Sequence, residues 1–223
     1  SIFGLTISSR ASPNEFFVRA HVRDAVASPP TSSELLAKMT SCAQISNGLY
    51  ATDDALPGTV QVCDANGAVW WKADMDIDCD GVTTPECNFN TDPAYQPDTA
   101  LHTSTDQPFN AATMPYVVLP SEKVSGIIWN YTSSNIQLGA VVAVIYNGKV
   151  EYGVFADTGP ADIIGEASYA MARALGIDPD PATGGAESGV TYLVFKASRV
   201  SPVESHAAAV SLGQQLAWQF LRT

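Results

Sequence analysis

Residues 152–176 read YGVFADTGPADIIGEASYAMARALG, and the prediction for the whole chain is built around this stretch. The apolar run Val154-Phe155-Ala156 indicates a buried strand, and Asp-Thr-Gly-Pro at 157–160 indicates a sharp break after it. A helix is expected over 166–175, ended by Gly176. Strand ends and helix starts present side chains to a cleft from rigid elements, so Asp157 and Glu166 are the first candidates for catalytic carboxylates.

These two acids match the needs of glycoside hydrolysis, in which one carboxylic acid protonates the leaving oxygen and a second carboxylate acts as base or nucleophile. Asp157 follows an apolar strand, which raises a carboxyl pKa and suits a general acid. Glu166 is expected at a helix start, where the helix dipole favours the ionised form and suits a base. The alternative is structural: Glu166 as an ordinary first-turn acid and Asp157 as a turn former.

A second acidic stretch lies at 72–80, where residue types alternate with the period of a strand. One face is predicted to carry Lys72, Asp74, Asp76, Asp78 and Asp80, and the other Ala73, Met75, Ile77 and Cys79. We consider three readings: a groove for a cationic polymer, a calcium loop and a solvated acidic face.

The calcium reading rests on Asp76-x-Asp78-x-Asp80-Gly81, which opens like a calcium-binding loop. The twelfth position is Cys87 rather than a bidentate Glu, so the match stops there.

Aromatic residues supply a third set of candidates. Trp70 and Trp71 are adjacent on a strand and must face opposite ways, so one is expected in the core. Tyr152 is a candidate for stacking on a sugar ring, and Thr158, beside Asp157, is a further candidate for substrate contact. The alternative for such an aromatic residue is a place in the core.

The composition indicates one domain with a sizeable core, since 46% of the 223 residues are hydrophobic. Residues 1–33, which contain a Pro- and Ser-rich run, are predicted to form an N-terminal arm, and 34–223 the domain. The net charge of -12 disfavours binding to nucleic acid or anionic lipid and favours cationic ligands, although it could serve solubility alone.

The sequence contains no apolar run of 18 or more residues, so we expect no membrane span. The motifs GxGxxG, P-loop, HExxH and GxSxG are also absent from the sequence. Ser-His-Asp catalysis therefore has no anchor in the sequence, and no metal is expected.

Four cysteines without a CxxC motif indicate two disulfides and an oxidising compartment, with metal ligation as the weaker alternative because the histidines are scattered. Of three connectivities we favour Cys42–Cys63 and Cys79–Cys87, since each closes a local loop. Asn130-Tyr131-Thr132 is an N-glycosylation sequon. Both features favour a secreted protein.

Elsewhere the pattern predicts an α+β domain dominated by short strands. Strands are expected near 49–52, 60–63, 69–81, 117–119, 126–129, 141–146, 150–155 and 190–196, with hairpins at Asn66-Gly67 and Asn147-Gly148. Helices are expected at 34–40, capped by a serine, at 166–175 and at 203–221. Residues 82–112 read as a long loop at the rim of a site.

Taken together, WWKADMDIDCDG (70–81) and the stretch 152–176 closely resemble the chitosanases of glycoside hydrolase family 75, over roughly residues 40–200. The resemblance implies a secreted fungal or actinobacterial endo-chitosanase that cleaves β-1,4 bonds with inversion and needs no cofactor. It assigns the essential acids to Asp157 and Glu166. Asp157-Thr158-Gly159 followed by Gly165 also resembles the D-T-G segment of double-psi β-barrel lytic transglycosylases, which implies a six-stranded, double-psi-like barrel with peripheral helices.

Chitosan is a polycation below about pH 6.5, so this substrate would explain an acidic groove lined by Asp74, Asp76 and Asp78, with Lys72 on the same face. We expect a monomer whose partner is chitosan. Two other functions fit the residues: a peptidoglycan-active barrel enzyme of the lytic transglycosylase type, and a non-catalytic, calcium-dependent carbohydrate-binding module that uses Asp76, Asp78 and Asp80.

Overall fold

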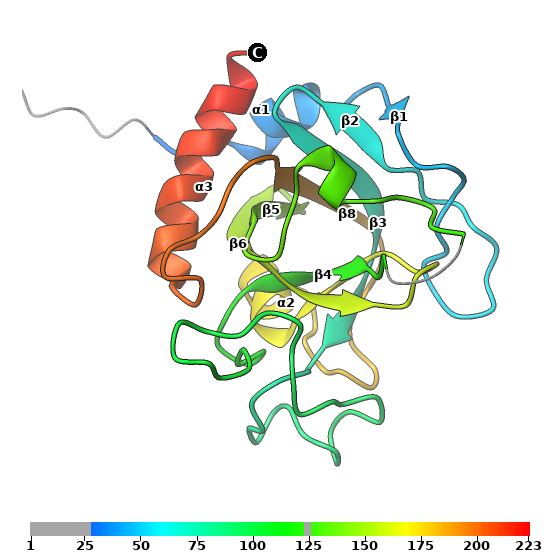
Figure 1. The fold of residues 1–223 in the computed structure, drawn as a ribbon, viewed down its shortest axis with the longest axis vertical. Helices are drawn as coiled ribbons and strands as arrows, with labels where there is room; N and C mark the ends of the chain where they lie inside the picture. The colour runs from blue at the N-terminus through cyan, green and yellow to red at the C-terminus, as the bar shows by residue number, and fades with distance from the viewer. Residues whose placement is uncertain (1–27, 123–125) are drawn as a thin grey trace, which may run out of the picture.

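The computed structural model describes residues 28–122 and 126–223 (Figure 1). Most of the predicted N-terminal arm therefore lies outside the described residues. The helices are α1 (Ser32–Ala37), α2 (Tyr169–Leu175) and α3 (His206–Leu221), with a 3-10 turn at Thr132–Ser134. The strands are β1 (Ala43–Gln44), β2 (Cys63–Ala65), β3 (Ala68–Asp78), β4 (Tyr116–Pro120), β5 (Val141–Tyr146), β6 (Lys149–Gly159), β7 (Glu166–Ser168) and β8 (Ala186–Phe195).

Six of these strands close into a barrel. The hydrogen-bonded order is β3-β7-β4-β6-β5-β8, and β8 pairs back onto β3. The β3–β7 and β4–β6 pairs are parallel, whereas the other four pairs around the barrel are antiparallel. β1 and β2 extend the sheet beyond β3. The predicted six-stranded, β-rich single domain with peripheral helices is confirmed.

Strand alternation divides the core into two layers. One cluster takes side chains from all six barrel strands, including Trp71, Val117, Phe155 and Tyr192, as the interior of a small barrel does. Trp71 is fully buried there and stacks on Tyr192 with ring centroids 5.2 Å apart. Trp71 therefore lies in the barrel interior, and Trp70, only 5% exposed, is buried as well, so both tryptophans belong to the core.

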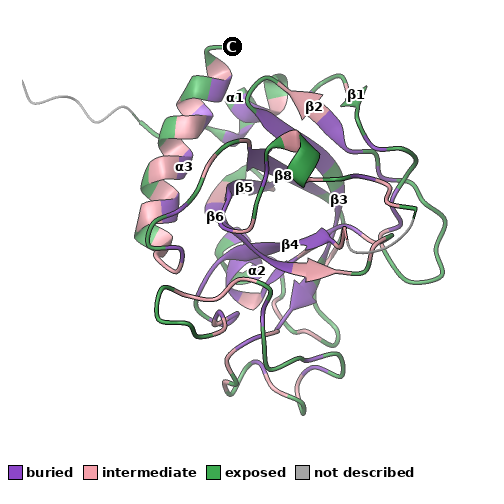
Figure 2. Cartoon of the chain, viewed as in Figure 1, coloured by how far each residue is buried: buried purple, intermediate pink, exposed green. Residues whose placement is uncertain are grey.

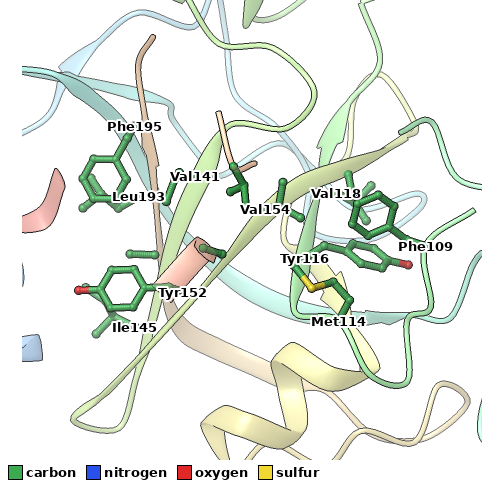
Figure 3. Close-up of a cluster of buried hydrophobic side chains, with 14 of the residues drawn as sticks. Phe109, Met114, Tyr116, Val118, Val141, Ile145, Tyr152, Val154, Leu193 and Phe195 are labelled. Atoms are coloured by element: carbon green, nitrogen blue, oxygen red, sulfur yellow. The ribbon is translucent and has the colours of Figure 1, made fainter. Parts of the chain in front are cut away.

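The other cluster lies on the outer face of the strands, part of which is drawn in Figure 3. It includes Tyr116 and Val118 of β4 together with Leu35 of α1 and Phe220 of α3. α3 contacts β5 and β6 along one side of the barrel (Figure 1). Figure 2 shows its buried residues interleaved with exposed ones, as expected of a helix packed on one face. Among the described residues, no helix is both long and apolar enough to cross a membrane.

Helix α1 begins two residues earlier than predicted. Its cap is Thr31 rather than a serine, since the Thr31 hydroxyl accepts from the Glu34 backbone N–H and the Glu34 carboxylate accepts from the Thr31 N–H. A capping box of this kind satisfies two N–H groups that a helix start leaves free, so it fixes where the helix begins.

The Asn66-Gly67 and Asn147-Gly148 hairpins are confirmed, because they join β2 to β3 and β5 to β6. The predicted strand at 126–129 is wrong: the segment is irregular, and Trp129 contacts Trp71 with ring centroids 6.0 Å apart. Only an isolated Tyr50–Val60 bridge joins the segments predicted as strands at 49–52 and 60–63.

Both favoured disulfides, Cys42–Cys63 and Cys79–Cys87, are present. The second anchors the long loop between β3 and β4, which contains no helix or strand (the green loops at the bottom of Figure 1). Cys79 lies in the outer cluster, so the predicted alternation holds for Ala73, Met75 and Ile77 and ends with β3.

Candidate active site

A bulge in β6 directs Asp157 away from the barrel interior. Val117 of β4 pairs with Phe155, but Val118 pairs with Asp157, so Ala156 is the extra residue. Phe155 points into the barrel, and regular alternation would send Asp157 there too. The bulge instead brings Asp157 to the outer face shared with Val118. β6 continues to Gly159, so the predicted chain break at 157–160 is wrong in position.

Glu166 does not start a helix, contrary to the prediction. It is the first residue of β7, and α2 begins three residues later with Ser168 as its cap. β7 lies between β3 and β4, so Glu166 is held by strand pairing on both sides. The helix-dipole argument for an ionised Glu166 is therefore lost.

Strand register places the two candidate acids in one row. Val118 pairs with Asp157 on one side and with Glu166 on the other, and Glu166 also pairs with Asp76 of β3. Side chains of directly paired residues point to the same face of a sheet. Two strand spacings separate Asp157 from Glu166, roughly 9.5 Å between Cα atoms. The Glu166 Oε2 atom also lies close to Gly159, within 3.2 Å of where a Cβ would stand.

This row forms the floor of a cleft of about 490 Å³. Among the described residues that line it, none is Lys, Arg or His, and eight are acidic: Asp53, Asp54, Asp76, Asp78, Asp80, Asp92, Asp157 and Glu166. Thr158 lines the cleft as well, as predicted, and so do Asp92 and Ala94 of the long loop. A cleft with this charge concentrates cationic ligands.

Asp157 is buried but well supplied with hydrogen bonds. Its Oδ1 atom accepts from the backbone N–H of Ala100 at 2.9 Å and of Thr158 at 2.8 Å. Burial raises its pKa to about 6, and the two N–H donors work against that rise. Asp157 therefore retains an ionised form at mildly acidic pH.

Glu166 differs, because no residue in the described part of the chain donates a hydrogen bond to its carboxyl group. Burial is the main cause that raises its pKa to about 8, and the negative charges of Asp76, Asp80 and Asp157 add to it. Burial and the charge of Glu166 likewise raise the pKa of Asp78 well above its usual value. Glu166 is thus held protonated where Asp157 is ionised.

Three other predicted contact residues lie elsewhere. Asp74 is buried beside the cleft without lining it, and Gly165 packs against its carboxylate. Lys72 borders a separate pocket next to the Cys42–Cys63 disulfide. Tyr152 packs against Gly213 of α3, on the outer side of the barrel. These three residues do not line the cleft that contains Asp157 and Glu166, because α3 covers one face of β6 and β3 passes out of the cleft before residue 76. Their contact with substrate stays a prediction.

The predicted calcium set is not assembled either. Carboxylate oxygens of Asp76 approach those of Asp53 and Asp74, whereas Asp78 and Asp80 approach Asp157. Asp53, Asp54 and Asp92 were missed because they lie on irregular segments, where no periodicity assigns a face. Asn130 is exposed and accepts a hydrogen bond from Thr132, and its glycosylation stays a prediction.

Comparison with known proteins identifies the family of this chain. The pattern of the family described as "Fungal chitosanase of glycosyl hydrolase group 75" matches residues 75–219. Curated relatives include an endo-chitosanase C from Aspergillus oryzae, 35% identical over 55% of this chain and 30% of its own length. An endo-chitosanase from Aspergillus fumigatus is 31% identical over 63% of this chain and 59% of its own length.

The fold and the site define a single-domain β-barrel protein with an acidic cleft, and the family match is more specific. The chain belongs to the fungal chitosanase family of glycosyl hydrolase group 75. It spans between about a third and three fifths of the length of these two relatives.

Proposed function

We propose that this chain is an endo-chitosanase that hydrolyses β-1,4 bonds of chitosan with inversion, using Asp157 and Glu166. The observation that carries the proposal is the shared row: both acids face one acidic cleft, on either side of Val118. An inverting pair needs about 6.5–9.5 Å between its carboxyl groups, so that a water molecule fits. Two strand spacings are compatible with that need, since the side chains can lean toward each other across the row.

We assign Glu166 as the general acid and Asp157 as the general base, the reverse of the roles expected from the sequence. Glu166 accepts no hydrogen bond from the residues that the structure describes, and burial raises its pKa, so it keeps a proton that it can give to the glycosidic oxygen. Asp157 accepts two backbone N–H bonds, so it is the better carboxylate to take a proton from water.

In this reaction, Glu166 protonates the oxygen that leaves from C1. Water attacks C1 from the opposite face of the sugar ring and gives a proton to Asp157. The proton that Glu166 loses is thus balanced by the one that Asp157 gains, and bulk water resets both groups after release of the products. This chain's own residues suffice for each step.

The other carboxylates would bind the substrate. Asp54 and Asp92 line the cleft without making the bond-breaking contacts, and they would attract the ammonium groups of successive glucosamine units. The two disulfides fit a secreted, extracellular protein, and we expect it to act as a monomer.

A reducing-end assay on chitosan, chitin, cellulose and peptidoglycan side by side tests the function. We expect new reducing ends from chitosan at a rate at least roughly tenfold above that from the neutral polymers, because only chitosan carries cations for the cleft. Preferred release of soluble peptidoglycan fragments would contradict the proposal and favour a lytic transglycosylase activity; it is followed separately, because such an enzyme leaves a 1,6-anhydro end and no reducing end. Binding to sugars without any release of reducing ends would favour a carbohydrate-binding module.

A further inference from the structure

We propose that Asp53, Asp74 and Asp76 form a binding site for a hard divalent cation, Ca²⁺, at the edge of the cleft. Asp53 lies in the loop after Tyr50, and Asp74 and Asp76 belong to β3. The inference goes beyond the proposed hydrolase activity and does not depend on it.

The carboxylates lie close enough to share one ion. Each of the three residues offers an oxygen atom, and all three oxygens lie within 4.8 Å of one another. Ca²⁺ binds oxygens at about 2.3–2.6 Å, so two ligands on opposite sides of the ion stand about 4.6–5.2 Å apart. Carboxylates select Ca²⁺, Mg²⁺ or Mn²⁺ over softer metals, and Ca²⁺ best tolerates irregular geometry with water in the remaining positions.

Asp74 provides the second observation, independent of the clustering. Its side chain is only 6% exposed, and its Oδ1 atom is buried without any hydrogen-bond partner among the described residues. A buried carboxylate oxygen is normally paired, because an unpaired one costs the full loss of its hydration. The carboxylate is also held in place, since Gly165 packs so closely that a Cβ there would lie 2.1 Å from Oδ1.

Within residues 28–122 and 126–223, no cation forms an ion pair with this cluster. The ion pairs in the described part of the chain join His102, Lys196 and His206 to other acids, and none includes the three aspartates. Glu187 of β8 adds further negative charge, since its field acts on both Asp74 and Asp76. A bound cation would give the buried Asp74 carboxylate a partner and offset the repulsion among these acids.

The other carboxylate cluster, formed by Asp78, Asp80 and Asp157, contains a proposed catalytic residue and is assigned to the hydrolytic site. The ammonium group of a glucosamine unit is the chemical rival for the first cluster, because it too is a cation that binds carboxylates. Because Asp74 is buried whereas Asp53 and Asp76 are exposed, a small ion can contact all three carboxylates more easily than an ammonium group attached to a sugar ring.

Terbium luminescence offers a direct test, since Tb³⁺ substitutes for Ca²⁺ and is sensitised by nearby aromatic rings. The Tyr192 hydroxyl donates to the Asp74 backbone carbonyl at 2.8 Å, and the Tyr192 ring stacks on Trp71. We expect sensitised emission when Tb³⁺ is added to the metal-free full chain, and loss of that emission when Ca²⁺ is added in excess. Saturating Ca²⁺ should also raise Tm by roughly 5–11 °C, the size expected for an ion present at about 100 times its Kd.

Adjacent aspartates provide the matched control. Asp53→Asn and Asp76→Asn should reduce the emission at least roughly tenfold, because a site of three carboxylates loses one of its few ligands. Asp54→Asn, next in sequence and exposed in the same cleft, should leave it unchanged, and so should Asp80→Asn in the other cluster. Asp53 and Asp76 are both exposed, so these variants test the site without removing a buried side chain.

Three results would overturn the proposal. Absence of sensitised emission would show that no such ion binds near Tyr192. Emission lost in Asp80→Asn but kept in Asp53→Asn would place the ion at the hydrolytic site. A Tm that rises with glucosamine oligomers and not with Ca²⁺ would make the cluster a substrate subsite, whether or not the chain hydrolyses chitosan.

Discussion

Replacing Glu166 with Gln is expected to lower kcat on chitosan by about 100- to 10,000-fold, the range over which general acid–base groups contribute. Gln keeps the size of the side chain but cannot give a proton to the leaving oxygen. An aryl glycoside of a glucosamine oligomer has a leaving group that needs no protonation. The same variant should therefore lose much less activity on that substrate, and an equal loss on both substrates would argue against Glu166 as the acid.

Asp157→Asn should cause a loss of similar size on chitosan, because water then has no base to accept its proton. An added small anion such as azide attacks without a base, so it should restore the turnover of Asp157→Asn. The aryl leaving group should not restore the turnover of this variant. Asp162→Asn is the matched control: Asp162 is exposed, lies close in sequence and does not line the cleft. It should retain normal kcat, and near-normal activity of Asp157→Asn would refute the role of that residue.

The second large effect is a fall in stability as pH rises from about 5 to 8. The folded-state pKa is about 6 for Asp157 and about 8 for Glu166, both above the values of unfolded carboxyl groups. The folded protein therefore binds more protons than the unfolded chain in this range, and each step up in pH favours unfolding. Burial also raises the pKa of Asp80, to about 7.

The smallest of these shifts, the rise in the pKa of Asp157 to about 6, sets the minimum size of this effect. A shift of two pKa units corresponds to about 3 kcal/mol, which in a domain of this size moves Tm by roughly 6–12 °C. We expect Tm to be highest near pH 5 and at least this much lower at pH 8, as measured by thermal unfolding across the range. Asp157→Asn should show a shallower dependence, and a Tm that is level or rises between pH 5 and 8 would contradict these pKa directions.

The sequence predicts most of the barrel because its signals are local. Alternation along 69–78, the two Asn-Gly hairpins and the apolar runs of β4, β5 and β8 each depend on neighbouring residues. The closure of the barrel is different, since it depends on β8 returning to β3 more than a hundred residues later. That feature came from the resemblance to known barrels and not from periodicity.

In the candidate site, too, some features follow from local sequence signals and others from pairing between distant strands. Asp157 and Glu166 are candidates that the sequence already proposes, and both line one cleft, but the sequence did not predict their surroundings. The bulge at Ala156 and the short strand β7 arise from pairing with β4, so the local pattern read them as a chain break and a helix start. The error reversed the expected roles, because a helix start favours an ionised Glu166 whereas burial among other acids favours a protonated one.

The stereochemistry of hydrolysis tests the central claim most directly. An inverting pair across Val118 requires that β-1,4 cleavage releases the new reducing end as the α-anomer. Proton NMR of the first minutes of chitosan hydrolysis, before mutarotation, distinguishes the two anomers. We predict that the α-anomer accumulates first; initial release of the β-anomer would mean retention and would contradict the Asp157–Glu166 mechanism.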